Sequence, residues 1–255
     1  MRSRLLLGAI VQNPPFTDQL ARKLATRALV DPGDLAAFAA LSWKQRSVPA
    51  ASYVVREGQP PVRCGFIIEG FAYRQKLTLD GQREIVALLV PGDLIDLQNL
   101  YFTQSDHDVV ALTALSLAEV PIVELRELAS MRPGIAAALW TDALIEASIY
   151  REWLLNIGRR PARIRLAHLL CEFHARLRAI HRAEEMEYEL PMTQEQLGDA
   201  MGLTPVHVNR VLKLLEQDGL IGRYKRQIKV TDWERLRTAA DFNDRYLHLD
   251  QAHVV

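Results

Sequence analysis

The chain has 255 residues, with 31 Lys and Arg against 31 Asp and Glu, so its formal net charge is zero. Because 49% of the residues are hydrophobic and two are cysteine, the composition excludes a mainly disordered chain and a disulfide-stapled scaffold, and it fits a reducing cytoplasm. The sequence has no run of about 18 apolar residues, so we expect a cytoplasmic protein of one large or two modest domains that does not span a membrane.

The first residues carry a pattern that superficially resembles a signal peptide. Arg2 and Arg4 precede an apolar run at residues 5–11. The run is short for an export signal, and two prolines follow it without a clear small-x-small cleavage site. We favour a segment that docks on the protein or on a partner, and we assign residues 1–34 to an N-terminal extension with a helix.

Residues 46–121 alternate between apolar stretches and turn residues, as in a set of short strands. The turn glycines recur every 11 or 12 residues and are Gly58, Gly70, Gly81 and Gly92. Turns at this interval are typical of an antiparallel barrel or sandwich. Asp80-Gly81 separates two alternating stretches and predicts a tight hairpin with positive φ at both residues. We expect a β-roll sensor domain at 35–132, with helices before it at about 16–42.

A long helix is predicted at 133–158. Pro133 suits a first helical turn, and residues 135–157 contain neither Pro nor Gly. The apolar band is wider than one neighbour requires, so we expect one face to pack on the β-roll and another on a second copy of the chain. The alternative is a core helix within a monomer. The expected dimerisation residues are Trp140, Leu144, Ile145, Ala147, Ile149 and Leu154.

Residues 159–237 carry 15 basic and 11 acidic side chains, a local net charge of +4 that suggests an anionic partner. Within this region, Thr193 and Gln196 form the pattern of a capping box at the start of a helix. Gly202 then supplies a turn, and Thr204-Pro205 begins a second helix. The sequence therefore predicts a helix-turn-helix, and a helical hairpin with solvated charges is the alternative.

A basic turn at residues 223–226 lies between two strand-like stretches and predicts a β-hairpin wing. A helix-turn-helix places its second helix in the major groove, where Arg matches the two acceptors of guanine and Asn can pair with adenine. Lysine one turn later and basic wing residues suit phosphate. We expect double-stranded DNA as partner. The candidate contact residues are Thr193, Gln194, Thr204, Val206, His207, Asn209, Arg210, Lys213, Lys225 and Arg226.

Taken together, these features resemble the CRP/FNR family of bacterial transcription regulators over about residues 35–232. The most specific matches are Glu69-Gly70, residues 91–95 and residues 193–221. The resemblance implies an α+β fold with a cyclic-nucleotide-binding-like β-roll, a long dimerisation helix and a C-terminal winged helix-turn-helix. It further implies a homodimer that binds two-fold symmetric DNA and recruits or blocks RNA polymerase.

The resemblance also places base readout on Val206, Asn209 and Arg210. Many members have a glutamate at the position of Val206, so the usual cytosine contact is in doubt and we expect an altered half-site. Cyclic-nucleotide members hold the phosphate with an Arg-Ser pair and the ribose with a Glu after the Gly-Asp turn. The corresponding segment, 93–110, contains no Arg and several Asp, so it is poorly suited to a phosphate. The candidate pocket residues are Asp93, Asp96, Leu97, Gln98, His107 and Asp108.

Neither a cofactor nor a metal is predicted, although a haem or a small-molecule effector stays open. Oxygen-sensing relatives hold an iron–sulfur cluster with several cysteines, and this chain has two. His168, Cys171 and His174 fan too widely over a helix to bind one metal alone, which favours a packing role.

No glycine loop, paired-His motif or nucleophile elbow suggests an enzyme. A small-molecule sensor that uses the winged domain at 159–237 for protein contacts is the second hypothesis. Residues 238–255 are predicted to form a C-terminal tail that packs through Phe242, Tyr246 and Leu249.

Overall fold

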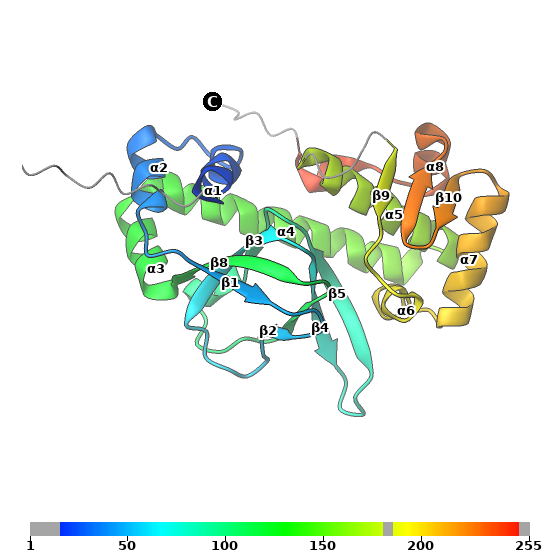
Figure 1. Ribbon diagram of the computed structural model, residues 1–255, viewed down its shortest axis with the longest axis horizontal. Helices are drawn as coiled ribbons and strands as arrows, with labels where there is room; N and C mark the ends of the chain where they lie inside the picture. The colour runs from blue at the N-terminus through cyan, green and yellow to red at the C-terminus, as the bar shows by residue number, and fades with distance from the viewer. Residues whose placement is uncertain (1–15, 181–185, 250–255) are drawn as a thin grey trace, which may run out of the picture.

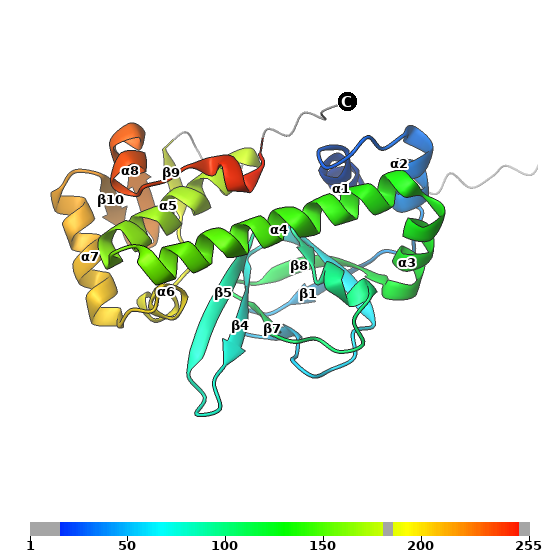
Figure 2. The same cartoon turned by 180° about the vertical axis from the view of Figure 1, so that it is seen from behind.

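The computed structural model describes residues 16–180 and 186–249 (Figure 1). The signal-like segment at residues 5–11 lies outside this range. A β-sandwich occupies one end of the molecule and a winged helical domain the other, and one long helix, α4, runs past both (Figure 2). No helix in the described part of the chain is both long enough and apolar enough to cross a membrane.

Two four-stranded sheets form the sandwich, with strand orders β1-β8-β3-β6 and β2-β7-β4-β5. The strands are β1 (Lys44–Val48), β2 (Tyr53–Val55), β3 (Arg63–Glu69), β4 (Ala72–Leu77), β5 (Arg83–Leu89), β6 (Leu94–Ile95), β7 (Asp108–Ala111) and β8 (Leu115–Pro121). All of their pairings are antiparallel. Ile67, Val109 and Leu117 are fully buried in the core of the sandwich. The predicted β-roll is confirmed.

The turn between β4 and β5 differs from the predicted two-residue hairpin. Gly81 has a φ of 83°, but Asp80 is absent from the residues with positive φ. The turn is longer because Thr78 closes it, donating its N–H to the carbonyl of Gln82 and accepting from Gly81. Only the glycine therefore needs the left-handed conformation.

Helices cover one side of the sandwich. They are α1 (Phe16–Ala25), α2 (Pro32–Ala39), the 3₁₀ turn η1 (Leu97–Leu100), α3 (Ile122–Met131) and α4 (Pro133–Arg159). Leu20, Phe38, Leu125 and Ile135 bury apolar surface in one shared core. At 27 residues, α4 extends for about 40 Å, long enough to contact both domains.

The winged domain follows directly after α4. Its elements are α5 (Ala162–Ala179), β9 (Glu187–Glu189), α6 (Gln194–Met201), α7 (Pro205–Gln217), β10 (Ile221–Tyr224), β11 (Gln227–Val230) and α8 (Trp233–Ala239). The helix predicted at 133–158 extends one residue further, to Arg159, and the break comes at Arg160 and Pro161. The short strand β9, which the sequence pattern did not predict, pairs with β11.

Two further contacts tie the domains together. Arg83 of β5 donates its Nε to Asp199 of α6 at 2.7 Å, so the first helix of the helix-turn-helix rests on the sandwich. After α8, the chain turns back over α4 and α5 and forms the 3₁₀ turn η2 (Asp244–Leu247). Phe242 and Tyr246 are buried there, as predicted, whereas Leu249 is exposed.

Candidate functional sites

The helix-turn-helix is held by short-range hydrogen bonds. The Thr193 hydroxyl accepts from the N–H of Gln196, whose side chain accepts from the N–H of Thr193, so the predicted capping box is present. Gly202 follows α6 with a φ of 61°, a conformation that glycine adopts without steric cost. Thr204 caps α7 by accepting from the N–H of His207. These contacts fix the angle at which α7 leaves the domain.

The inner face of α7 packs on the domain core, and its outer face meets solvent. Val208, Val211, Leu212 and Leu215 are buried. On the outer face, Val206 is 80% exposed, and Arg210 and Lys213 are exposed without an ion-pair partner among the described residues. The remaining predicted contact residues are exposed (Thr193, Gln194, Thr204, Lys225, Arg226) or half-buried (His207, Asn209).

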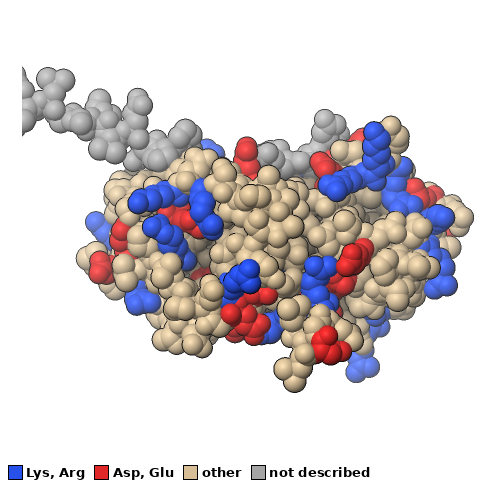
Figure 3. Space-filling model, turned by 60° about the horizontal axis from the view of Figure 1, so that its bottom comes forward, with Lys and Arg blue, Asp and Glu red and all other residues tan. Residues whose placement is uncertain are grey.

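The hairpin of β10 and β11 forms the predicted wing. An ion pair of 2.5 Å between Arg223 and Glu216 fastens it to the end of α7. At its tip, Lys225 has a φ of 56° and lies with its Nζ 5.3 Å from the centre of the Tyr224 ring. Basic side chains spread over this end of the molecule (Figure 3). The surface is suited to a negatively charged partner.

A cavity of about 620 Å³ lies between the sandwich and α4. Of the predicted pocket residues, Leu97, Gln98 and His107 line it. Asp96 is buried behind them, and Asp108 is also buried, where it accepts from the N–H of Glu57 and the amide of Gln75. Asp93 lies apart, on a second cavity beside α1 and α5, and pairs with Arg176 at 2.6 Å.

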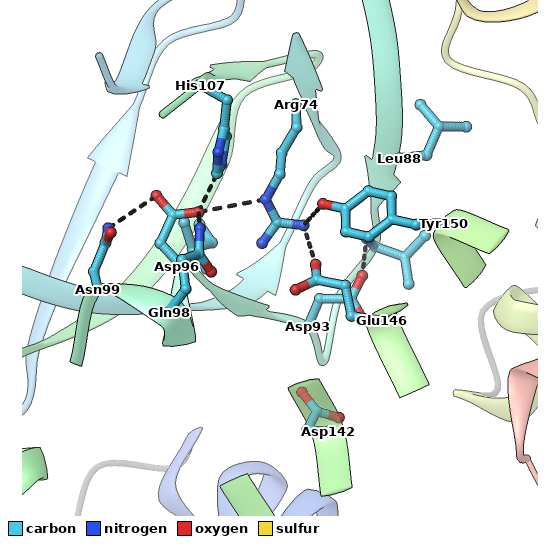
Figure 4. A network of polar contacts seen from close by, with 12 residues as sticks. Arg74, Leu88, Asp93, Asp96, Gln98, Asn99, His107, Asp142, Glu146 and Tyr150 are labelled. Atoms are coloured by element: carbon cyan, nitrogen blue, oxygen red, sulfur yellow. Dashed lines mark hydrogen bonds and ion pairs between the residues drawn. The ribbon is translucent and has the colours of Figure 1, made fainter. Parts of the chain in front are cut away.

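Arg74 of β4 lies just behind the lining of the cavity between the sandwich and α4, where it contacts the lining residues Glu146 and Tyr150, and it was not among the predicted site residues. The guanidinium is 1% exposed and contacts Asp96 at 3.3 Å, Glu146 of α4, and the Tyr150 hydroxyl at 3.4 Å (Figure 4). His107 adds a 3.0 Å contact to Asp96. The sequence offers one sign of this role, an Arg within a strand-like stretch. It does not reveal the partners of Arg74, because they are distant in the chain.

The ionisation of this group follows from its contacts. Burial lowers the pKa of Arg74, but Glu146, Tyr150 and Asp96 raise it by more. The pKa therefore lies above its ordinary value, and the guanidinium stays protonated. Burial raises the pKa of Asp96, but His107 and Arg74 more than offset this and hold it below its usual range. Arg74 therefore holds a buried ion pair with Asp96 inside the sandwich domain, and its contact with the half-buried Glu146 joins this domain to α4.

The side chains weighed for haem or metal binding are engaged elsewhere. Both ring nitrogens of His107 lie within 3.0 Å of aspartate oxygens, from Asp96 and Asp106. His168 and His174 are buried against aromatic rings, and burial lowers their pKa values to about 3 and about 4. Within residues 16–180 and 186–249, no three His, Cys, Asp or Glu side chains are grouped to hold a metal ion.

The expected dimerisation residues fall on two sides of α4. Leu144 is 63% exposed, and Trp140 and Leu154 are exposed on the same face. Ala147 is half-buried between them. Ile145 is buried, and Ile149 packs on the core of the winged domain, so both contact their own chain. Trp140, Leu144, Ala147 and Leu154 therefore form one largely exposed apolar stripe along α4.

Comparison with known proteins decides the family. Residues 164–239 match the Crp-like helix-turn-helix domain, and residues 45–132 match the cyclic nucleotide-binding domain. The chain is 31% identical over 228 residues to the transcriptional activator protein FnrL of Cereibacter sphaeroides, covering 88% of this chain and 91% of that protein. The chain belongs to the CRP/FNR family of transcription regulators.

Other members of the CRP/FNR family agree. Nitrogen fixation regulation protein FixK of Bradyrhizobium diazoefficiens is 29% identical over 175 residues, 68% of this chain and 72% of that protein. The structure of FixK2 from Bradyrhizobium japonicum superimposes with a TM-score of 0.72 at 27% identity, covering 78% of this chain and 98% of that one. The chain is therefore a DNA-binding transcription regulator and not an enzyme, and its helix-turn-helix binds the DNA.

Proposed function

We propose that this regulator acts as a homodimer that reads a two-fold symmetric DNA site through α7. The observation that carries the proposal is the outer face of α7, where Val206, Arg210 and Lys213 are exposed and neither cation has an ion-pair partner among the described residues. Its relative FnrL is described as an activator, and we extend activation, with RNA polymerase as the further partner, to this chain. The functional parts are the extension at 1–34, the sensor at 35–132, the dimerisation helix at 133–158, the winged domain at 159–237 and the tail from 238.

Base readout is assigned to Val206, Asn209 and Arg210 at the start of α7. The Arg210 fork matches the O6 and N7 acceptors of guanine, and Asn209 suits adenine. Val206 offers a methyl surface, which suits the methyl group of thymine and not the amino group of cytosine. The half-site should therefore contain a guanine fixed by Arg210.

The other candidate residues are assigned to the DNA backbone, because they lie at the surface on α7 or on the elements beside it. Backbone contacts set the register of the protein on the duplex without carrying sequence information. This group comprises Thr193, Gln194, Thr204, His207, Lys213, Lys225 and Arg226.

Dimerisation is assigned to the exposed stripe of Trp140, Leu144, Ala147 and Leu154. These residues follow a heptad-like spacing on one face of α4, and Arg151 interrupts the stripe. Two copies paired along α4 can present their α7 helices one helical turn of DNA apart, about 34 Å.

The sensor domain is proposed to work without the family's usual phosphate contact. Arg74 is a buried cation beside the candidate pocket residue Asp96, and it is already paired with Asp96 and Glu146. A cyclic phosphate entering here would meet two carboxylates before a free cation.

A titration with labelled duplexes tests the DNA-binding assignment. A site selected from a random pool and a scrambled duplex are titrated by fluorescence anisotropy at two salt concentrations. Arg210→Ala should cost about 1–3 kcal/mol on the selected site and relax the choice at one base pair. Equal losses on both duplexes would refute base reading by Arg210. The absence of any salt-dependent DNA affinity would instead support a protein-interaction role for the winged domain.

A further inference from the structure

The cavity between the sandwich and α4 is the strongest candidate for an effector site, and its lining defines the chemistry of what it can hold. Its volume of about 620 Å³ suits a small molecule. Most of its surface comes from apolar and aromatic side chains of β5, η1, the loop after η1, α3 and α4. The aliphatic part of this surface includes Val86, Leu97, Leu100 and Leu139.

The charged side chains that line the cavity are all paired within the chain. The pairs are Lys76 with Glu57, His107 with Asp96 and Asp106, and Glu146 with Arg74. A charged group on a ligand would leave water without gaining an unpaired opposite charge, which is unfavourable. An uncharged ligand loses nothing in this way.

The aromatic side chains of the wall favour an aromatic ligand. The rings of Tyr101 and Trp140 lie nearly parallel, 5.8 Å apart between centres and 23° between planes. Aromatic rings gain energy from offset stacking and edge contacts with another ring. Phe102 and Tyr150 add two further rings to the lining.

The face of α4 that borders the cavity has small residues where a ligand needs room. Ala136, Ala143 and Ala147 share this face, since positions three, four and seven apart lie on one side of a helix. Trp140 and Ala147 also belong to the proposed dimerisation stripe. A ligand in the cavity would therefore touch both the sandwich and the helix that sets the spacing of the two DNA-binding domains.

We propose that this cavity binds an uncharged, largely apolar aromatic molecule and passes its presence to the dimerisation helix. The inference rests on the proposed sensor role of residues 35–132 and names the class of ligand for it. The hydroxyls of Tyr101 and Tyr150 and the amide of Gln98 are uncharged polar groups of the lining that can orient a hydroxyl or amide of the ligand.

Three ligands with the same aromatic body and different charge test the proposal on the full chain. They are naphthalene-2-methanol, naphthalene-2-carboxylate and 2-naphthylmethylamine, measured by isothermal titration calorimetry alongside cyclic AMP. The neutral alcohol should bind with one molecule per chain. Each charged analogue should bind at least about tenfold more weakly, because its charge finds no partner. Tighter binding of either charged analogue or of cyclic AMP, equal binding of all, or no binding of the alcohol would overturn the proposal.

A cavity-filling variant locates the binding. Ala143→Trp should abolish binding of the alcohol, whereas Ala50→Trp, at an exposed position away from the cavity, should leave it unchanged. Circular dichroism and the anisotropy assay establish that both variants fold and bind DNA. Unchanged binding in a folded Ala143→Trp protein would overturn the assignment. If Ala143→Trp does not fold, Ala147→Leu is measured with the same criteria.

The two proposals fail separately. Wild-type protein that binds the alcohol but no DNA refutes the DNA-binding assignment and leaves the ligand class standing. Wild-type protein that binds DNA but prefers a charged ligand refutes the ligand class alone.

Discussion

The winged domain and the sensor domain place their charged side chains in opposite ways. On α7, Arg210 and Lys213 stand in solvent without an ion-pair partner among the described residues. In the sensor domain, Arg74 is buried against two carboxylates. Exposed cations can exchange water and counterions for DNA phosphate, whereas a buried pair has no charge left to offer. The exposed cations of α7 are therefore suited to bind an anion. The buried cation of the sensor domain instead connects the sandwich to α4.

Removing the buried cation should have the largest effect. Arg74→Leu leaves the buried Asp96 and the half-buried Glu146 without their cation, so we expect the free energy of unfolding to fall by about 3–5 kcal/mol in urea denaturation at fixed protein concentration. The control is Arg46→Leu, which breaks an exposed pair with Glu119 and should cost about 0–1 kcal/mol. Similar losses for both variants would contradict the contrast between buried and exposed charges.

Placing a charge on the outer face of α4 should have the next largest effect. In Leu144→Glu, two like charges would meet across the proposed dimer contact, so sedimentation should show monomers at concentrations where the wild type is dimeric. Binding to a full two-fold site should weaken about tenfold or more, because a monomer contacts one half-site. Leu79→Glu, on the exposed β4–β5 turn, should remain dimeric. An unchanged mass for Leu144→Glu would place the dimer contact elsewhere.

Removing the cation at the tip of the wing should have a smaller effect on DNA affinity, and this effect should be the same for every DNA sequence. Lys225→Ala should weaken selected and scrambled duplexes alike and reduce the slope of log affinity against log salt by about 1, because one phosphate contact is lost. Lys44→Ala, exposed on the sensor domain, serves as the matched control and should leave the slope unchanged. A loss confined to the selected site would give Lys225 a role in base reading.

The smallest effect should be a pH dependence in the sensor domain. Burial lowers the pKa of His107, but its hydrogen bond and charge interaction with Asp96 raise it more, so the folded value lies above the ordinary 6.5. This contribution to stability is complete below 6.5 and is lost as the pH rises through the raised pKa.

Urea denaturation at about pH 6 and about pH 8 measures this effect against His107→Gln. Subtracting the variant removes the contributions of His168 and His174, which are present in both proteins. The wild type should lose more stability than the variant over this interval. A greater loss in the variant would reverse the sign and contradict the Asp96–His107 contact.

The sequence by itself determined the winged domain and the proposed DNA contacts. Thr193 bonds a backbone group three residues away, and Thr204 does the same. Gly202 and the buried stripe of α7 act over a few turns of helix. Such signals depend on neighbours in the chain, so they can be recognised from spacing alone. The alternation and turn glycines of the β-roll are equally local.

The tertiary structure decided the sensor cavity and the faces of α4. Arg74 meets residues 22 and 72 positions away, and Asp93 pairs with Arg176, 83 positions away. The apolar band of α4 gave no sign that Ile145 faces its own chain while Leu144 faces solvent. Which side chains meet across such separations depends on how the sheets and helices pack, and a helix with several apolar faces leaves its orientation to its neighbours.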